Sequence, residues 1–243
     1  MRNLLLTISI CFLMTVPTFA ATPATNPSYH STKDTLKNIT PDAELKRLME
    51  GNTRFVNNKP IQRNLLQQAK VTSLQGQFPG AVILSCMDSR GSPELIFDQG
   101  LGDVFSIRVA GNVVDTDQLG GLEFATKVTG SKLIVVMGHT KCGAIKGACE
   151  NVKLGNLTDL LAKIQPAVAT VKNATNTNLD CSNYKTVKDI AKQNVLDMMQ
   201  EIKNKSSIIN DLLNNKQIRM VGAMHDLHSG KVVFFDETGN DTK

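Results

Sequence analysis

The sequence predicts an α/β fold: a single domain with a central, mostly parallel β-sheet flanked by helices, and a helical arm at the N-terminus. Short apolar runs rich in β-branched residues occur at 81–85, 103–110 and 132–138, and each ends in Gly or polar residues. Helical patterns fill the intervals, and such alternation is typical of parallel sheets. The length of 243 residues, with 41% hydrophobic and 20% charged residues, is ordinary for one such domain.

Residues 1–20 have the pattern of a secretory signal peptide. Arg2 precedes an apolar stretch from Leu4 to Val16, and small residues lead to Ala20, where we expect cleavage. A membrane anchor is the alternative, but this stretch is short for a bilayer span and no second long apolar run follows it. We therefore expect a periplasmic protein without stable membrane insertion.

Residues 21–40 are rich in Thr, Ser, Pro and Asn, which predicts a flexible linker or arm. The folded domain is expected at 41–243. Thr40 followed by Pro41 is typical of a helix start, and Leu45, Leu48 and Phe55 continue at helical spacing. A second amphipathic helix is expected over 64–74.

Beyond these helices, the elements continue to alternate. The three apolar runs predict buried strands, and the residues between and after them predict helices over 118–128 and 143–150. Residues 157–214 read as mostly helical, with an Asn-rich break near 173–178. Two more strands are expected within 217–226 and 230–236, and no internal repeat is visible.

The charge pattern argues against a nucleic-acid partner. The formal net charge is +5, but Lys and Arg are scattered, and the chain has two Tyr and no Trp that could stack on bases. A mildly cationic surface that favours small anions is the preferred interpretation.

Two predicted strands are followed by residues that can bind a metal. Cys86 and Asp88 lie in the stretch SCMDSR, directly after the run at 81–85, and His139 and Cys142 lie in GHTKCG, at the end of the run at 132–138. Because the carboxyl ends of parallel strands open into one crevice, all four side chains can meet there.

Thiolate, imidazole and carboxylate together are the donors that Zn²⁺ prefers, which makes Zn²⁺ the expected cofactor. Taken alone, Cys86 reads as a buried strand cysteine and His139 as a structural histidine. A disulfide between Cys86 and Cys142 is a further alternative. The combination of the two pairs favours a metal site.

Arg90 distinguishes a catalytic metal from a structural one. Two thiolates and a neutral imidazole balance the charge of Zn²⁺, so Asp88 is either a fourth ligand or a neighbour of the site. Arg90 can hold the Asp88 carboxylate in a charge-assisted fork and leave the fourth position to water. Zinc-bound water ionises near pH ~7, and Asp88 would then orient the resulting hydroxide.

Two other pairs of residues leave alternatives open. Cys149 and Cys181 form either a disulfide in an oxidising compartment or two separate thiols. His225 and His228 hint at a second metal, but HDLHSG reads better as a turn between two strands.

The motifs resemble those of the β-class carbonic anhydrases. CMDSR is similar to the family's Cys-x-Asp-x-Arg signature and GHTKCGA to its Gly-His-x-x-Cys-Gly signature. SIRVAGNVV, GNTRFV and MVGAMHDLHSGKVVFF also fit the family's pattern, so that the resemblance covers about residues 40–236. It implies that 41–243 is a catalytic domain for reversible hydration of CO₂ to bicarbonate and a proton, by attack of zinc-bound hydroxide.

The resemblance also implies a role for each site residue. The zinc ligands are Cys86, His139 and Cys142, and Asp88 and Arg90 form the catalytic dyad, with Asp88 a fourth ligand only in a closed state. Gln77 falls where the family places a glutamine that binds a substrate oxygen across a dimer interface, and Phe105 where an aromatic residue lines the CO₂ pocket.

The implied assembly is a homodimer or homotetramer. Two departures from relatives are visible: Gly91 replaces a frequent Val, which loosens the loop, and without Trp the chain lacks one known type of inhibitory bicarbonate site. Two alternative functions stay open. The same fold could hydrolyse carbon disulfide or carbonyl sulfide, or the protein could be a non-catalytic, zinc-braced interaction protein.

Overall fold

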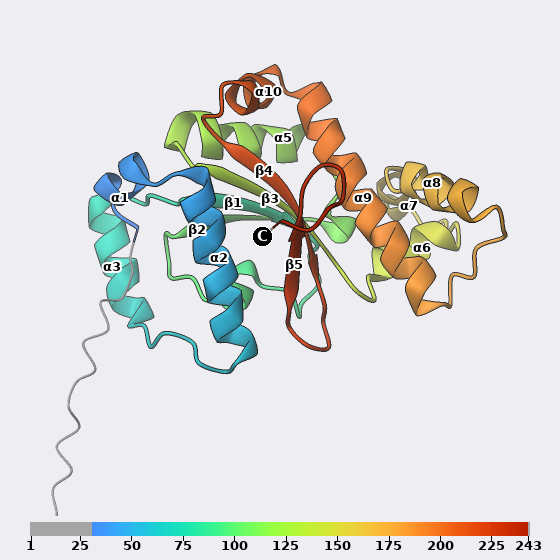
Figure 1. Ribbon diagram of the computed structural model, residues 1–243, viewed down its shortest axis with the longest axis horizontal. Helices are drawn as coiled ribbons and strands as arrows, with labels where there is room; N and C mark the ends of the chain where they lie inside the picture. Colours follow the sequence, from blue (N-terminus) through green and yellow to red (C-terminus); the bar gives the residue numbers. More distant parts are fainter. Residues whose placement is uncertain (1–30, 243) are drawn as a thin grey trace, which may run out of the picture.

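A five-stranded sheet with the strand order β2-β1-β3-β4-β5 lies at the centre of the protein (Figure 1). The computed structural model describes residues 31–242. The strands are β1 (Ala81–Ser85), β2 (Val104–Arg108), β3 (Leu133–His139), β4 (Arg219–His225) and β5 (Val232–Phe235). All neighbouring strands are parallel except β4 and β5. The predicted, mostly parallel sheet is confirmed.

Three helices precede the sheet: α1 (Lys33–Asn38), α2 (Pro41–Val56) and α3 (Leu65–Gln75). Helix α1 falls within the stretch that the sequence analysis assigned to a linker. A capping box between Thr32 and Thr35 starts it, and Leu36 is its one buried residue. The backbone N–H of Ser31 donates to the buried Asp103 carboxylate at 2.8 Å. These contacts hold the end of the predicted linker against the domain.

The predicted signal peptide at 1–20, and the predicted linker up to residue 30, lie outside the described residues. Among residues 31–242, no helix combines the length and the apolar character needed to cross a bilayer.

Each face of the sheet has its own core, because side chains alternate along a strand. Ala81 and Ile83 point to a cluster formed with α2 and α4 (Pro93–Ile96), whereas Val82 and Leu84 point to a larger cluster on the other face. The helices of that larger face are α5 (Thr116–Glu123), η2 (Phe124–Thr129), α6 (Gly143–Cys149), α7 (Leu157–Ala162), α8 (Gln165–Thr175), α9 (Tyr184–Lys205) and α10 (Ser207–Asn214). The domain thus has three layers.

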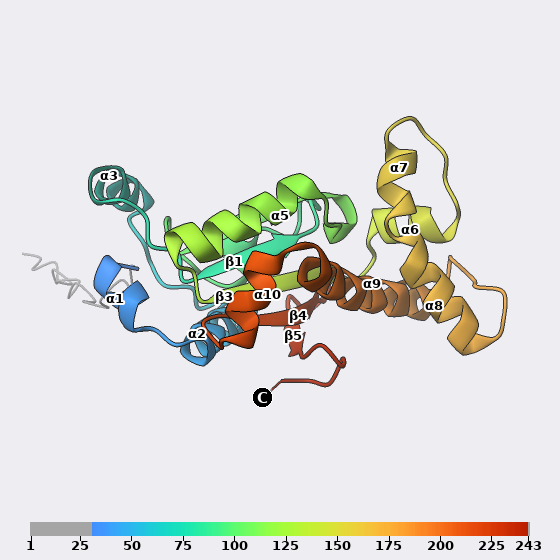
Figure 2. The same cartoon turned by 90° about the horizontal axis from the view of Figure 1, so that it is seen from above.

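The two ends of the molecule differ in character. Helices α1 and α3 lie at one end, and α6, α7 and α8 lie at the other (Figure 2). At the second end, Cys149 and Cys181 form a disulfide, which decides between the two alternatives left open by the sequence. Short elements such as α4 and η1 (Ala110–Asn112) were not predicted, because three or four residues carry no periodicity.

The order of the strands creates a topological switch point at the carboxyl ends of β1 and β3. The chain passes from β1 to β2 on one side, and then crosses to β3 on the other side of β1. The segments that leave β1 and β3 therefore diverge, and such a switch point is where ligands bind in open α/β sheets. Ser85 at the end of β1 is in register with Met137, two residues before the end of β3.

Candidate metal centre

Three buried side chains converge at this switch point. Cys86 directly follows β1, His139 is the last residue of β3, and Cys142 is the N-cap of α6. Their ligand atoms all lie within 4.8 Å of one another. The residues are 7%, 5% and 2% exposed, respectively. The structure thus brings together the three residues that the sequence analysis proposed as zinc ligands.

The spacing of the sulfur atoms fits a tetrahedral metal ion. Cys86 Sγ and Cys142 Sγ are 3.9 Å apart. Two Zn–S bonds of ~2.3 Å at a tetrahedral angle place the sulfurs about 3.8 Å apart. Both sulfurs can therefore share a zinc ion with little movement. No other group of three such donors lies this close together within residues 31–242.

The imidazole of His139 is oriented as a metal ligand requires. Its Nδ1 lies 2.9 Å from the carbonyl oxygen of Thr140. Because a carbonyl can only accept, Nδ1 carries the hydrogen and Nε2 presents its lone pair. Nε2 is buried and has no hydrogen-bond partner. Metal-binding histidines typically donate the N–H of their other ring nitrogen to such an acceptor, because this hydrogen bond fixes the tautomer and the direction of the ring.

The two thiols cannot both ionise easily in the protein alone. A hydrogen bond from Cys142 lowers the pKa of the Cys86 thiol, with His139 and the Gly111 N–H adding to the effect. The same pairing with Cys86, together with burial, raises the pKa of Cys142. The pair thus behaves as one thiolate and one thiol that share a proton. A dication between the sulfurs would stabilise both thiolates, which is the condition for zinc binding.

The loop that carries Cys86 is held by the end of β2. The Arg108 guanidinium donates to the carbonyl oxygens of Cys86 and Asp88. The Gly111 N–H points to Cys86 Sγ at 3.4 Å, and Gly111 has a φ of 68°, which glycine adopts without strain. The sequence analysis noted the segment SIRVAGNVV only as part of a resemblance, and it assigned no role to Arg108.

Asp88 is paired with Arg90 and is not among the three converging donors. Arg90 Nε donates to Asp88 Oδ1 at 2.9 Å, and Arg90 Nη2 donates to Asp88 Oδ2 at 2.7 Å. Asp88 Oδ2 lies 3.9 Å from His139 Nε2. The expected fork between Asp88 and Arg90 is therefore present, although Gly91 follows it.

The Arg90 fork also fixes the charge of Asp88. It holds the pKa of the Asp88 carboxyl well below its usual range. A lowered pKa means that the fork stabilises the fold above pH ~4, and that this contribution is lost only as the pH falls through the lowered value. Asp88 is therefore ionised throughout the neutral range.

The two predicted substrate-binding residues lie elsewhere in the single chain. Gln77 is exposed in the loop between α3 and β1 and does not belong to the group of three converging donors. Phe105 lies on β2, half-buried, with its ring edge-to-face against Phe124 at a centroid distance of 6.1 Å. Phe105 packs against the same apolar cluster that includes Cys86 and Cys142.

His225 and His228 do not form a second metal site. His225 is buried on β4, in register with His139, whereas His228 is exposed in the turn that leads to β5. Burial, with His139 nearby, lowers the pKa of His225 to about 4, so it is neutral at physiological pH. The expected turn between two strands is confirmed.

Comparison with known proteins identifies the family. The family model described as carbonic anhydrase matches residues 81–232, a range that includes all three donors. The chain belongs to the carbonic anhydrase family. Carbonic anhydrase 2 of Mycobacterium tuberculosis is 33% identical over 210 residues, which cover 84% of this chain and 98% of the relative.

Solved β-class structures share the fold of this carbonic anhydrase. The β-carbonic anhydrase CcaA matches with a TM-score of 0.66 at 23% identity, covering 82% of this chain and 98% of that chain. A match to the tetrameric β-carbonic anhydrases of the ascomycete Sordaria macrospora has a TM-score of 0.64 at 24% identity, covering 74% and 89%. The resemblance found in the sequence is confirmed. This protein is a β-class carbonic anhydrase, a zinc-dependent enzyme that hydrates CO₂.

The geometry of the donors predicts the effect of removing one of them. We expect the purified enzyme to hold about one zinc ion per chain, and the Cys142→Ala variant to hold almost none, because a tetrahedral site then keeps only two of its three protein ligands. Mass spectrometry of the metal content measures this. Met87→Ala, a change at a 63% exposed side chain beside Cys86, should keep its zinc. Equal zinc in the Cys142→Ala variant and the parent would place the metal elsewhere.

Proposed function

We propose that Cys86, His139 and Cys142 hold the zinc ion with which this enzyme reversibly hydrates CO₂ to bicarbonate and a proton. The observation that carries the proposal is the convergence of three buried donor atoms, with a sulfur spacing that suits a tetrahedral ion. Zinc bound there would supply hydroxide near neutral pH, by lowering the pKa of a water molecule that it holds.

Asp88 and Arg90 would decide whether solvent can reach that ion. Both oxygens of Asp88 accept hydrogen bonds from Arg90, which keeps the carboxylate with the guanidinium and leaves the fourth position to solvent. Because Asp88 is ionised, it can accept a hydrogen from a solvent molecule at that position and so orient its lone pair toward CO₂. A purely structural zinc site has no use for this arrangement.

The substrate itself needs placement more than tight binding. CO₂ has no net charge or dipole, so an apolar wall that holds it beside the nucleophile is sufficient. Phe105, which packs against the cluster containing Cys86 and Cys142, would form part of that wall. Gln77 would bind a substrate oxygen in the site of a neighbouring chain, which agrees with its exposed position in a single chain.

Stopped-flow CO₂ hydration by the zinc-loaded enzyme tests these roles. We expect Asp88→Ala to keep its zinc but to lose about 100-fold in kcat/KM, because a positioned proton acceptor is removed. Because Arg90 is largely exposed, water can solvate its guanidinium in the Asp88→Ala variant. Asp211→Ala removes an exposed carboxylate on α10 and should behave like the parent. Parental activity in the Asp88→Ala variant would refute the role of Asp88, and an inactive zinc-loaded parent would refute the proposed function.

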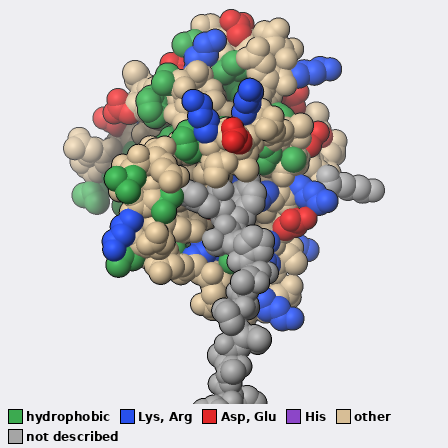
Figure 3. Space-filling view, turned by 90° about the vertical axis from the view of Figure 1, so that its left-hand side faces the viewer, with side chains coloured by type: hydrophobic (Ala, Val, Ile, Leu, Met, Phe, Trp, Pro, Cys, Tyr) green, Lys and Arg blue, Asp and Glu red, His purple; other side chains and the backbone are tan. Residues whose placement is uncertain are grey.

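We also propose that the enzyme works as a homodimer, or as a tetramer built from dimers. Strand β2 is an edge strand, with β1 as its one partner in the sheet. Large apolar side chains are exposed beside it and at the N-terminal end: Leu65 53%, Leu66 68%, Leu74 87%, Leu95 69%, Phe124 51% and Val128 72%. Apolar groups are also visible on the face shown in Figure 3. Another copy of the chain would cover them.

Size-exclusion chromatography with light scattering tests the assembly. We expect the parent to have at least twice the mass of one chain. The double variant Phe124→Ser, Val128→Lys should shift to the mass of one chain, because a charge replaces apolar surface at the proposed interface. Leu154→Lys changes a side chain of similar exposure (68%) in the loop between α6 and α7, and it should leave the mass unchanged. A parent with the mass of a single chain would contradict the proposal.

We propose further that the enzyme is exported to the periplasm. The leader-like pattern of residues 1–20 supports this, and so does the disulfide, because such bonds persist in oxidising compartments.

Fusing residues 1–30 to alkaline phosphatase, which is active only after export, tests the leader. We expect activity from this fusion, and little from one that lacks residues 1–20. Activity that does not depend on residues 1–20 would contradict export through this leader.

A further inference from the structure

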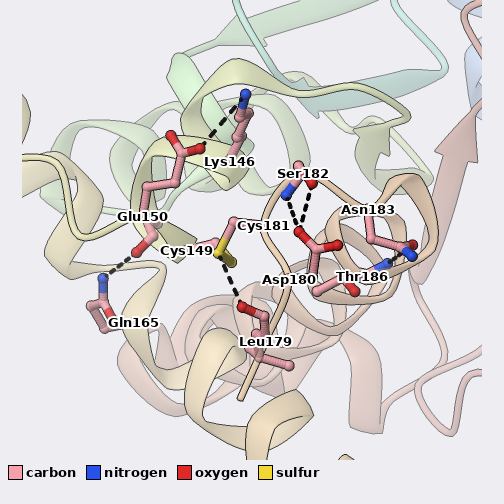
Figure 4. The surroundings of a disulfide bond; sticks show 11 residues. Lys146, Cys149, Glu150, Gln165, Leu179, Asp180, Cys181, Ser182, Asn183 and Thr186 are labelled. Carbon is pink, nitrogen blue, oxygen red and sulfur yellow. Dashed lines mark hydrogen bonds and ion pairs between the residues drawn. A yellow bond between two sulfur atoms is a disulfide. The ribbon is translucent and has the colours of Figure 1, made fainter. Parts of the chain in front are cut away.

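The disulfide between Cys149 and Cys181 joins the end of α6 to the segment that precedes α9 (Figure 4). Cys149 is the last residue of α6, and Cys181 lies two residues before Asn183, the N-cap of α9. The two Cα atoms are 5.8 Å apart, a usual separation for a disulfide. The reaction itself has no use for either sulfur.

Helix α6 connects the disulfide to one proposed zinc ligand. It has seven residues, with Cys142 as its N-cap and Cys149 as its last residue. Because a helix this short moves as a unit, a shift of its last turn displaces the Cys142 sulfur as well. Ile145 and Ala148 are its buried residues, and the carbonyl oxygen of Ala148 accepts a hydrogen bond from Gln165 at 2.8 Å. Helix α6 also packs against α7, α8, α9 and η1, and the disulfide adds a covalent link to this packing.

Helix α9 connects the disulfide to the other sulfur ligand. Asn194 of α9 is completely buried, and its Nδ2 donates to the carbonyl oxygen of Gly111 at 2.9 Å. The N–H of the same Gly111 points to Cys86 Sγ. Space around Gly111 is tight, since a Cβ atom built there would lie 2.7 Å from Ile164 Cδ1. A movement of α9 would therefore also move the backbone at Gly111, beside Cys86 Sγ.

The segment that carries Cys181 has few other attachments. Residues 176–183, between α8 and α9, are exposed except for Leu179 and Cys181, which are half-buried. Its hydrogen bonds are mainly local, such as those from Ser182 to Asp180 (Figure 4). The Lys185 N–H likewise donates to the side chain of the Asn183 cap. The disulfide is thus its covalent attachment to the end of α6.

We propose that Cys149 and Cys181 are positioning residues for the metal centre: their disulfide holds α6 against the start of α9 and thereby fixes the distance between the Cys86 and Cys142 sulfurs. The proposal rests on the proposed zinc ligands. The enzyme without the bridge keeps its fold but releases zinc faster, because the two sulfurs no longer stay at the spacing that a tetrahedral ion needs.

Zinc release from the loaded holoenzyme to a chromogenic chelator tests the proposal. The variant is Cys149→Ser with Cys181→Ser, since a single change would leave a thiol able to pair with a zinc ligand. We expect release about tenfold faster than in the parent, well below the melting temperature of both. In the cobalt-substituted proteins, the sulfur-to-metal absorption band should also shift, which a general loss of stability does not cause.

The matched control separates positioning from stability. Leu48→Ala truncates a completely buried side chain on α2, in the apolar cluster on the opposite face of the sheet. It should lower the melting temperature while releasing zinc at nearly the parental rate. The proposal is overturned if the double serine variant releases zinc at the parental rate, or if Leu48→Ala accelerates release as much as the double variant does.

A chemical arm covers the case in which the double variant does not fold. The folded, zinc-loaded parent is treated with a water-soluble phosphine, which breaks the S–S bond: the phosphine is oxidised to its oxide with oxygen from water, and two thiols form. Mass spectrometry then confirms a gain of two hydrogens. Faster zinc release after reduction supports the proposal, and an unchanged rate in fully reduced protein overturns it.

Failure of this proposal differs from failure of the proposed function. If Cys86 and Cys142 do not hold the metal, Cys142→Ala keeps its zinc whatever the state of the bridge. If they hold it but the bridge has no influence, zinc is lost in the Cys142→Ala variant and the release rates with and without the bridge agree.

Discussion

The protein depends on one geometric constraint: two parallel neighbouring strands, β1 and β3, end side by side while the chain leaves them in opposite directions. Side chains that follow both strands can therefore meet at this switch point. Cys86 follows the last residue of β1, and His139 is the last residue of β3. Strand β3 thus fixes His139, and Cys142 starts helix α6. Arg108 and Gly111 hold Cys86 beyond the end of β1.

Hydrogen bonding divides the polar groups at this switch point into two sets. His139 turns one nitrogen to a carbonyl and leaves the other without a partner, and the two thiols have mainly each other. Asp88, by contrast, is fully engaged with Arg90. In a protein that binds no metal, buried polar groups without hydrogen-bond partners, such as those of the first set, would lower the stability of the fold. It is reasonable in a zinc enzyme, where the ion satisfies the first set and the second has to remain off the ion.

Much of this could be predicted from the sequence, because the strands and the donors are local signals. The apolar runs that became β1, β2 and β3 were found with errors of at most two residues at either end, and Cys86, His139 and Cys142 were found from donor chemistry beside them. Helix α1 was missed, because it is held against the domain by the hydrogen bond from Ser31, just before it, to distant Asp103 and by the burial of Leu36. Arg108 was missed for the same reason, since its contacts are carbonyls of the loop that follows β1. The partner of Cys149 is equally a matter of tertiary structure, because a thiol carries no information about which other thiol it will meet.

Arg108 has a consequence for how such an enzyme can evolve. It is the last residue of β2, and β2 is the outermost strand of the sheet on the side where apolar side chains are exposed. Strand β2 therefore has two roles. Its backbone forms the outer edge of the sheet, and its last side chain, Arg108, donates to the carbonyl oxygens of Cys86 and Asp88. Substitutions that reshape this edge would be inherited together with small changes in reactivity. We therefore expect related chains to vary their quaternary structure through other surfaces, where substitutions do not affect the residues around Cys86.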